Sequence, residues 1–266
     1  MRLMTPVRSG LCLLALAYPA ASFAQGTTET PDFVTDRPDF TESSEVVGRG
    51  LVQVESGFVL EADQSSRAIT TPAVLARIGL SRRMELRVGG EGFLRSWDRG
   101  QAGGAVSGGS DMEVGAKVKL LSFTHFAAAV IPAVSIPTNN PNFSSGAYDP
   151  TVKATWSTVL PRDFGLSGNV NVSRPTDAVG RFTQTAVSVS LGHDLAGGWG
   201  GYWEAFSFSP MERGADVGWT LNSGVTRSVG RDMQIDIEAG RGVTPDALDW
   251  FVGFGFAIRR PFVPRR

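Results

Sequence analysis

The chain is poor in the residues that most often carry chemistry in enzymes. Of 266 residues, one is cysteine and two are histidine, His125 and His193. Cys12 lies in an N-terminal apolar run, so the chain beyond it has no disulfide, thiolate nucleophile or cysteine-ligated metal. Two histidines far apart in sequence also disfavour a histidine metal site. We therefore expect neither a metal nor a cofactor.

Long apolar runs and a strong net charge are missing as well. After residue 24 no stretch approaches the run of about 18 apolar residues that a transmembrane helix needs. Charged residues make up 19%, below the usual quarter or so, and 25 basic residues face 26 acidic ones. Because nucleic-acid binding needs a clustered basic surface, no nucleic-acid partner is expected.

The N-terminus has the pattern of a secretory signal peptide. Arg2 and Arg8 precede the short apolar run LCLLALA, and Ser22-Phe23-Ala24 forms a small-x-small cleavage site. An N-terminal anchor helix is the alternative, but Pro19 and the shortness of the run disfavour it. Residues 1–24 are therefore predicted to be a signal peptide that exports the chain.

Residues 74–94 have the sequence pattern of a β-hairpin, and the same pattern is the basis for interpreting the remainder of the chain. In VLARIGL and MELRVGG, apolar residues alternate with charged or small ones, and SRR separates the two runs. Successive side chains on a strand point to opposite faces, so each run has one apolar face. A soluble sandwich buries that face in a core, whereas a membrane barrel turns it towards lipid and keeps a polar lumen. The hairpin alone allows both.

The same alternation continues to the end of the chain and predicts about twelve strands. Each is near the roughly 9–11 residues that a tilted strand needs to cross a bilayer. The predicted strands are 50–62, 69–81, 84–95, 111–121, 126–137, 150–160, 165–174, 183–194, 199–209, 216–229, 233–242 and 249–260.

The lengths of the connections favour the membrane barrel over the sandwich. Short turns follow every second strand, and most of the other connections are longer Gly/Ser/Asn loops, such as residues 96–110 and 138–149. Outer-membrane barrels have this asymmetry, with the short turns periplasmic. We predict an all-β chain with a transmembrane antiparallel up-and-down barrel over residues 50–260 and both termini periplasmic. An extended periplasmic segment, residues 25–49, precedes the barrel, and a short tail, residues 261–266, follows it.

Charged residues on the non-apolar strand faces are candidates to line the pore. As a functional site they would set charge selectivity, and as a structural one they would form ion pairs that hold a narrow barrel closed. Both signs occur among them, which argues against strong selectivity for one charge. The candidates are Arg77, Glu85, Arg87, Glu91, Glu113, Lys117, Lys153, Glu204, Asp236 and Glu238.

A charged block before the first strand invites a second role. Residues 35–43 read TDRPDFTES, and the block is predicted to fold back as a plug or to brace the mouth of the barrel. Asp39 and Glu42 are expected to pair with lumen arginines such as Arg77 or Arg87. A structural lead-in to the first strand is the alternative. The candidate residues of the block are Asp36, Arg37, Pro38, Asp39 and Glu42.

Several stretches together resemble a known family. TDRPDFTES, GLVQVESGF at 50–58, LARIGLSRRMELRVGG at 75–90, SIPT at 135–138 and WFVGFG at 250–255 are similar to the outer-membrane transporters of the phenol meta-degradation pathway family. The resemblance spans nearly the whole chain after the signal and implies a β-barrel in the bacterial outer membrane. It also implies passage of small, hydrophobic or aromatic, solutes.

Three functions remain open at this point. The first is a channel or transporter, with outer-membrane lipid, the barrel assembly machinery and a small solute as its partners. The second is a plugged barrel with a structural or adhesion role. The third is a lipid hydrolase, which needs a serine activated by histidine. Because Ser190 is three residues from His193, the two side chains are predicted to face opposite sides of a strand.

Overall fold

A computed structural model describes residues 32–64, 66–98, 104–210 and 212–262. Two short 3-10 turns, η1 (Pro161–Asp163) and η2 (Ala196–Gly198), accompany the strands. No helix within the described ranges is both long and apolar enough to cross a membrane. The strands are β1 (Leu51–Asp63), β2 (Ser66–Gly79), β3 (Met84–Gly90), β4 (Phe93–Asp98), β5 (Val106–Gly109), β6 (Met112–Ser122), β7 (Phe126–Ile136), β8 (Pro150–Val159), β9 (Gly165–Ser173), β10 (Thr176–Asp177), β11 (Gly180–Arg181), β12 (Gln184–Leu195), β13 (Trp199–Ser209), β14 (Gly218–Ser228), β15 (Met233–Gly242) and β16 (Trp250–Pro261).

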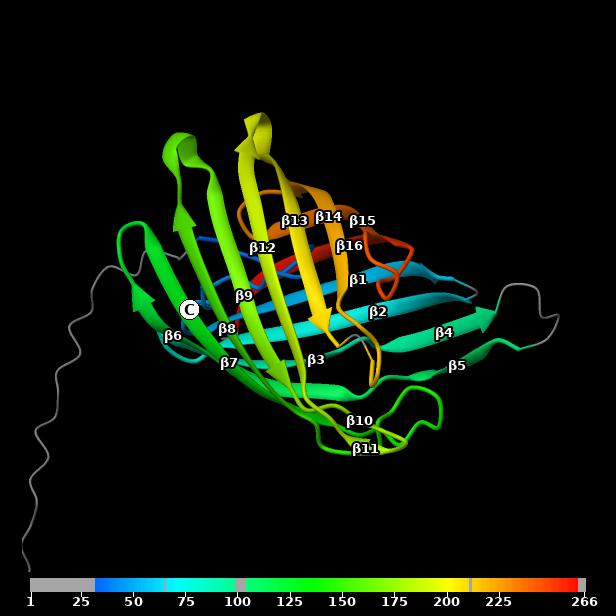
Figure 1. Ribbon diagram of the computed structural model, residues 1–266. Helices are drawn as coiled ribbons and strands as arrows, with labels where there is room; N and C mark the ends of the chain where they lie inside the picture. The colour runs from blue at the N-terminus through cyan, green and yellow to red at the C-terminus, as the bar shows by residue number, and fades with distance from the viewer. Residues whose placement is uncertain (1–31, 65, 99–103, 211, 263–266) are drawn as a thin grey trace, which may run out of the picture. The chain divides into compact units, whose positions relative to one another are not determined.

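The main sheet closes on itself. Strand β1 pairs antiparallel with β2 on one side and with β16, the last strand, on the other. The remaining wall strands pair antiparallel in an unbroken circuit (Figure 1). Since β3 with β4 and β5 with β6 each make one interrupted strand, the circuit is a twelve-stranded barrel. The predicted fold class is confirmed.

One strand pair departs from the prediction. The strand expected over 84–95 breaks at Glu91–Gly92, and its neighbour breaks at Ser110–Asp111 and begins at Val106 rather than 111. Gly92 has φ +73°, and a Cβ there would collide with the Pro72 carbonyl oxygen, so the break needs glycine. The loop predicted over 96–110 is therefore partly strand, because both strands resume beyond their breaks.

The burial pattern is the reverse of a soluble protein. Polar and charged side chains fill the inside, and the largest fully buried ones include Arg77, Lys117 and Glu85. Large apolar side chains face outward; Trp203, for example, is 66% exposed. A soluble sandwich does not bury arginine and lysine while exposing tryptophan, whereas a membrane barrel does both.

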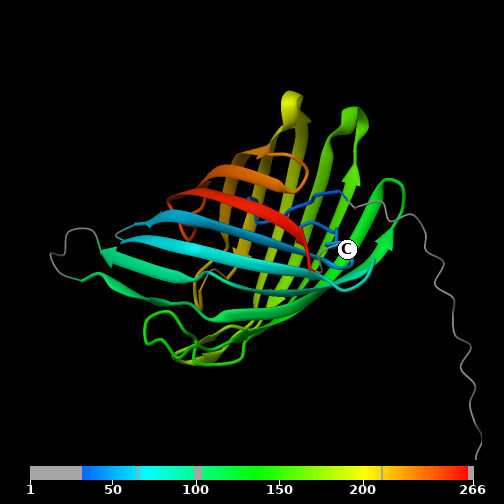
Figure 2. The same ribbon diagram turned by 180° about the vertical axis from the view of Figure 1, so that it is seen from behind.

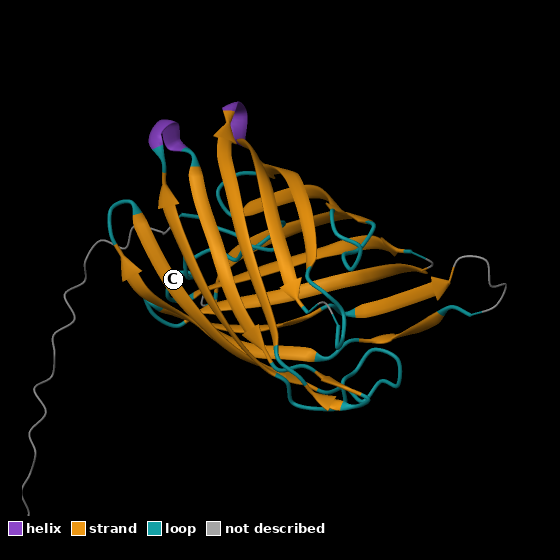
Figure 3. Ribbon diagram, viewed as in Figure 1, coloured by secondary structure: helices purple, strands orange, loops and turns teal. Residues whose placement is uncertain are grey.

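The connections follow the predicted asymmetry. The turns of β2–β3, β6–β7, β8–β9, β12–β13 and β14–β15 are short, and the longer loops lie mostly at the other end of the strands, as Figure 3 shows. The two-residue β10–β11 hairpin belongs to one of the long loops. At that end Arg213 joins two loops through an ion pair of 2.6 Å to Asp177.

Residues 32–49, hereafter the lumen segment, form no strand and lie inside the barrel. In Figure 2 their dark-blue trace lies within the curve of the strands. The predicted extended segment began at residue 25, and its first residues, like the whole predicted signal peptide 1–24, lie outside the described residues. The segment, rather than strand side chains alone, fills the middle of the lumen.

Candidate functional site

The lumen segment makes a loop from one wall to the opposite wall and back. It starts near β16, where Arg259 Nη1 donates to the Asp32 carbonyl over 2.8 Å. It reaches β13, where the amide of Phe40 donates to Glu204 Oε2 over 2.9 Å. It returns to β1, where the Leu51 amide donates to the Gly48 carbonyl over 3.0 Å. Contacts on both sides fix the segment across the bore.

Asp36 is the centre of the contacts on one side. Its carboxylate lies 2.9 Å from Lys117 Nζ, 2.5 Å from Arg87 Nη1 and 3.4 Å from Arg77 Nη1. Burial alone would raise the pKa of Asp36, but the three positive charges outweigh it and hold this pKa well below its usual range. Asp36 is therefore a fixed anion that three strands share.

Glu42 binds the same side of the lumen from further along the segment. Its carboxylate lies 3.0 Å from Arg87 Nη2 and 2.6 Å from Lys153 Nζ. Burial would raise its pKa, yet the charges of Arg87 and Lys153 lower the pKa of Glu42 to about 2. Nearby, Glu45 forms an ion pair with Lys119.

These cations define what we call the basic wall: Arg77, Arg87, Lys117, Lys119 and Lys153 of β2, β3, β6 and β8. The wall contains some anions of its own. Arg77 Nη1 lies 3.0 Å from Glu55, and Arg77 Nε lies 2.8 Å from Glu85. Together with Glu113, which lies 3.9 Å from Lys153, these carboxylates are still fewer than the five cations, and the lumen segment adds further negative charge.

The side of the lumen opposite the basic wall carries negative charge. We call Glu204, Asp236 and Glu238, on β13 and β15, the acidic wall. Arg37 Nη2 lies 3.0 Å from Asp236 Oδ1 and 3.8 Å from Glu238 Oε1. Glu204 accepts hydrogen bonds from the Phe40 and Thr41 amides. The segment thus presents a cation and backbone donors to this wall.

Asp39 differs from its neighbours because it faces the acidic wall. Burial and the negative charge of Glu204 raise the pKa of Asp39 well above its usual range. The expected pairing of Asp39 with Arg77 or Arg87 does not occur. Asp36 takes that role instead, while Glu42 pairs with Arg87 as expected.

Four aromatic rings meet where the segment turns. The ring of Phe40 stacks on Phe206 with centroids 4.8 Å apart, and Phe208 packs edge-on at 5.2 Å. Phe251 lies 6.5 Å from Phe206. Offset and edge-to-face pairs of this kind stabilise packing beyond the area they bury. This apolar patch anchors the tip of the segment among polar walls.

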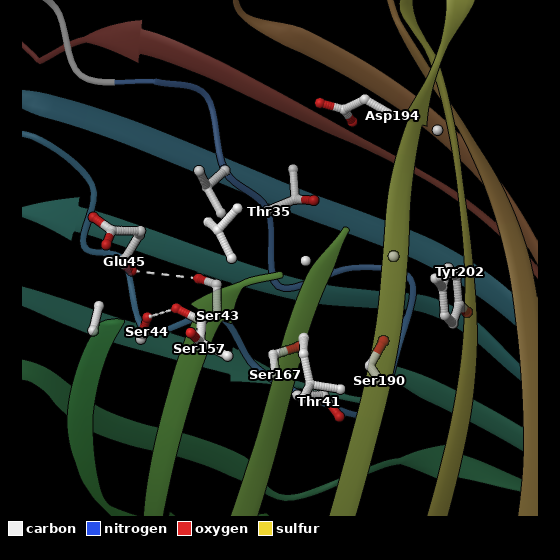
Figure 4. Close-up of a pocket in the computed structure, with 18 of the residues that line it drawn as sticks. Thr35, Thr41, Ser43, Ser44, Glu45, Ser157, Ser167, Ser190, Asp194 and Tyr202 are labelled. Carbon is white, nitrogen blue, oxygen red and sulfur yellow. Dashed lines mark hydrogen bonds between the residues drawn. The ribbon is translucent and has the colours of Figure 1, made fainter. Parts of the chain in front are cut away.

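A cavity of about 690 Å³ lies between the segment and the short-turn end of the barrel. Hydroxyl groups dominate the surface drawn in Figure 4, where Ser157, Ser167 and Ser190 project from three neighbouring strands. From the segment come Thr35, Ser43 and Ser44, and Ser44 Oγ lies 2.5 Å from Ser157 Oγ. The cavity is large enough for a small solute and offers hydroxyl groups together with charged side chains such as Asp39, Glu45 and Asp194.

A family model places the chain among known proteins. The family described as "Putative MetA-pathway of phenol degradation" matches residues 35–259, from the TDRPDFTES block to the last strand. The chain belongs to this family. The resemblance noted from the sequence is therefore confirmed, and among curated proteins nothing matches the chain.

Solved barrels support the fold of this family member. The COG4313 outer membrane channel from Pseudomonas putida F1 has a TM-score of 0.61 at 14% identity, covering 82% of this chain and 98% of that one. The NanC porin has a TM-score of 0.53 at 8% identity, covering 78% and 98%. At such identities the likeness establishes the fold alone.

Most of the pore-lining candidates come together in the lumen of this family member. Arg77, Glu85, Arg87, Lys117, Glu204, Asp236 and Glu238 are all buried. Lys153 and Glu113 are partly exposed and lie 3.9 Å apart. Glu91 does not join them, since it is exposed at the β3–β4 break.

Other lumen residues were not among the candidates. Glu55 shares a face of β1 with Gln53, and Lys119 shares a face of β6 with Lys117, so the period-two pattern contained the signal for both. The aromatic residues Phe206, Phe208 and Phe251 lie on the inner face, where the pattern alone suggested polar side chains.

The structure does not bring a serine and a histidine together as the lipid-hydrolase hypothesis requires. Ser190 is buried and faces inward, whereas His193 Nε2 lies 3.2 Å from the Arg162 carbonyl and its ring contacts Phe164. Neither histidine forms a hydrogen bond with a serine anywhere in the described part of the chain. The described residues likewise contain no group of three His, Cys, Asp or Glu side chains that could hold a metal.

Proposed function

We propose that the chain is an outer-membrane channel for small solutes whose bore is closed or narrowed by the lumen segment. The single observation that carries the proposal is the segment itself, which binds both charged walls across the middle of a polar lumen. Rings of charged side chains in such a bore select among solutes, and a segment held by polar contacts can be displaced.

The proposed topology follows from the barrel. Both termini and the short turns lie on the periplasmic side, the signal peptide 1–24 exports the chain, and the barrel assembly machinery inserts it into the outer membrane. Outer-membrane lipid then surrounds the exposed apolar band. The 690 Å³ cavity would be the periplasmic vestibule, which a solute meets after it passes the segment.

The proposed solutes are small, and aromatic ones are included. The Phe40–Phe206–Phe208 patch supports this choice because an aromatic solute can stack on the wall rings once Phe40 moves away. Glu204 on the same strand accepts a hydrogen bond from the Phe40 amide and would offer a partner to a polar group on the same solute.

Single-channel conductance tests the proposal. The mature protein, with and without residues 25–49, is refolded and its folding is verified by heat-modifiable gel mobility before measurement in planar bilayers. We expect rare or small openings from the full protein and large, steady steps from the shortened one. Silence from both folded proteins would overturn the proposal.

A plugged structural barrel is the second candidate, and the filled lumen favours it. It predicts no conductance in either protein and no change in solute uptake when the segment is destabilised. The same bilayer experiment therefore separates the two functions.

A further inference from the structure

The guanidinium group of Arg37 lies against two glycines of the barrel, and we call this contact surface its seat. Gly57 of β1 and Gly255 of β16 are directly opposite one another in the register that closes the barrel. A Cβ on Gly57 would lie 2.6 Å from Arg37 Cζ, and a Cβ on Gly255 would overlap the same guanidinium group. Any larger residue at either position would therefore displace the group.

The next inward position on β16 is also glycine. Gly253 pairs with Glu238, and a Cβ on Gly253 would lie 2.6 Å from Glu238 Oε1. The carboxylate of Glu238 thus lies over the bare backbone beside the Arg37 group. We call Gly57, Gly253, Gly255, Asp236 and Glu238 together the guanidinium slot.

The carboxylates of the slot have more capacity than Arg37 uses. Asp236 is 2% exposed, and only its Oδ1 bonds to Arg37. Its Oδ2 has no hydrogen-bond partner among the described residues. Two carboxylates beside a flat glycine floor suit a planar cation with several N–H donors better than a compact ammonium group.

We propose that the guanidinium slot is a binding site for guanidinium compounds, filled by Arg37 when the lumen segment is docked and by a solute when it is not. The second half rests on the proposed channel function, since a solute must reach the lumen. A guanidinium-bearing solute would then compete with Arg37, and its binding would favour release of the segment.

The charges around the slot support this ligand class. Among the described residues, Arg37 is the only cation with an ion pair to Asp236 or Glu238. Asn222 and Tyr202, the other groups bonded to Glu238, are neutral. Removing the Arg37 side chain therefore leaves two carboxylates without a positive partner and a space of the matching shape.

Chemical rescue tests the proposal. Full mature Arg37→Ala protein in detergent is titrated with methylguanidinium, and binding is followed by ligand-observed NMR and by the shift in Tm. We expect Arg37→Ala to bind methylguanidinium at least tenfold more tightly than wild type does and to recover part of its lost Tm. Methylammonium should bind Arg37→Ala at least tenfold more weakly than methylguanidinium.

Two controls separate the slot from general charge effects. Arg49→Ala removes an exposed arginine of the same segment and should behave as wild type. Adding Gly255→Ala to Arg37→Ala refills the slot with a methyl group and should abolish the rescue. If Arg37→Ala does not fold, Arg37→Gln is titrated in its place.

Equal binding to wild type and Arg37→Ala, or undiminished rescue in the double variant, would overturn the slot. These readouts need no current, so a barrel that never conducts would refute the channel function and leave the binding result to stand by itself. Binding without any increase in segment release, measured as thermolysin cleavage before the buried Val47, would overturn the competition.

Discussion

The basic and acidic walls meet the same segment in different ways. On the basic wall, carboxylates from β1 and β3 already hold Arg77, and Asp36 and Glu42 add further anions. The acidic wall has neutral partners of its own, and Arg37 supplies its positive charge. Buried charges without partners are costly, so each wall depends on the segment for part of its stability. The segment is therefore part of the electrostatic structure of the barrel.

The largest effect is expected on the basic wall, from Asp36→Ala. The substitution leaves Arg77, Arg87 and Lys117 without their shared anion, and breaking a buried ion pair costs about 3–5 kcal/mol. We expect rapid thermolysin cleavage of the segment before Val47, which is buried when the segment is docked, together with a lower Tm. Protease protection and heat-modifiable mobility measure the two effects.

Glu45→Gln is the matched control for Asp36→Ala. The Glu45 side chain is 42% exposed, so loss of its pair with Lys119 should change stability by less than about 1 kcal/mol. Equal cleavage rates for the two variants would show that burial does not set the strength of these contacts.

Acid should weaken the same wall through Glu42. The docked pKa is about 2, below the value of about 4.3 expected for a free chain, so docking favours the ionised carboxylate. This contribution, up to about 3 kcal/mol, is present above about pH 5 and is lost as the pH falls towards 2. Protease resistance after brief incubation across this range measures it, and Glu42→Gln should remove that part of the pH dependence.

Asp39, which faces the acidic wall, is expected to give docking of the segment the opposite pH dependence. Its pKa is raised, so docking favours the protonated carboxyl, and its contribution falls as the pH rises through that pKa. Asp39→Asn should therefore protect the segment at pH 7 at least as well as wild type. Faster cleavage of Asp39→Asn at pH 7 would contradict the proposed environment of this residue.

A smaller effect is expected at the tip, where charge is not involved. Phe40→Ala removes the stacking on Phe206 and Phe208, at a cost of about 2 kcal/mol for a half-buried ring. The cleavage rate of the segment should rise with little dependence on pH. Phe123→Ala, which removes a ring that is 67% exposed, should leave cleavage unchanged.

The local sequence pattern predicted the barrel because the alternation of apolar and polar residues in each strand shows which face is which. Val170 and Asn171 show their orientation within a few residues, and the lengths of the connections distinguished lipid from a soluble core. The β3–β4 break was missed because it depends on the contact between Gly92 and Pro72, about twenty residues apart in sequence.

The arrangement of the lumen segment could be predicted only in part. The charged residues of the segment predicted ion pairs with the lumen, and the pair of Glu42 with Arg87 was among those expected. The pairing of Arg87 with Asp36 rather than with Asp39 depends on how the backbone turns around Pro38, which no periodicity describes. The seat of Arg37 was missed because Gly57 and Gly255 are almost two hundred residues apart and meet only in the closed ring.

That meeting has a consequence for how the protein is made. Gly57 belongs to the first strand of the barrel and Gly255 to the last. The surface beneath Arg37 is therefore completed only when these two strands pair and close the barrel. A nascent sheet that is still open has no seat for this side chain. Docking of the Arg37 side chain thus has to follow ring closure, and it distinguishes a closed barrel from an open sheet.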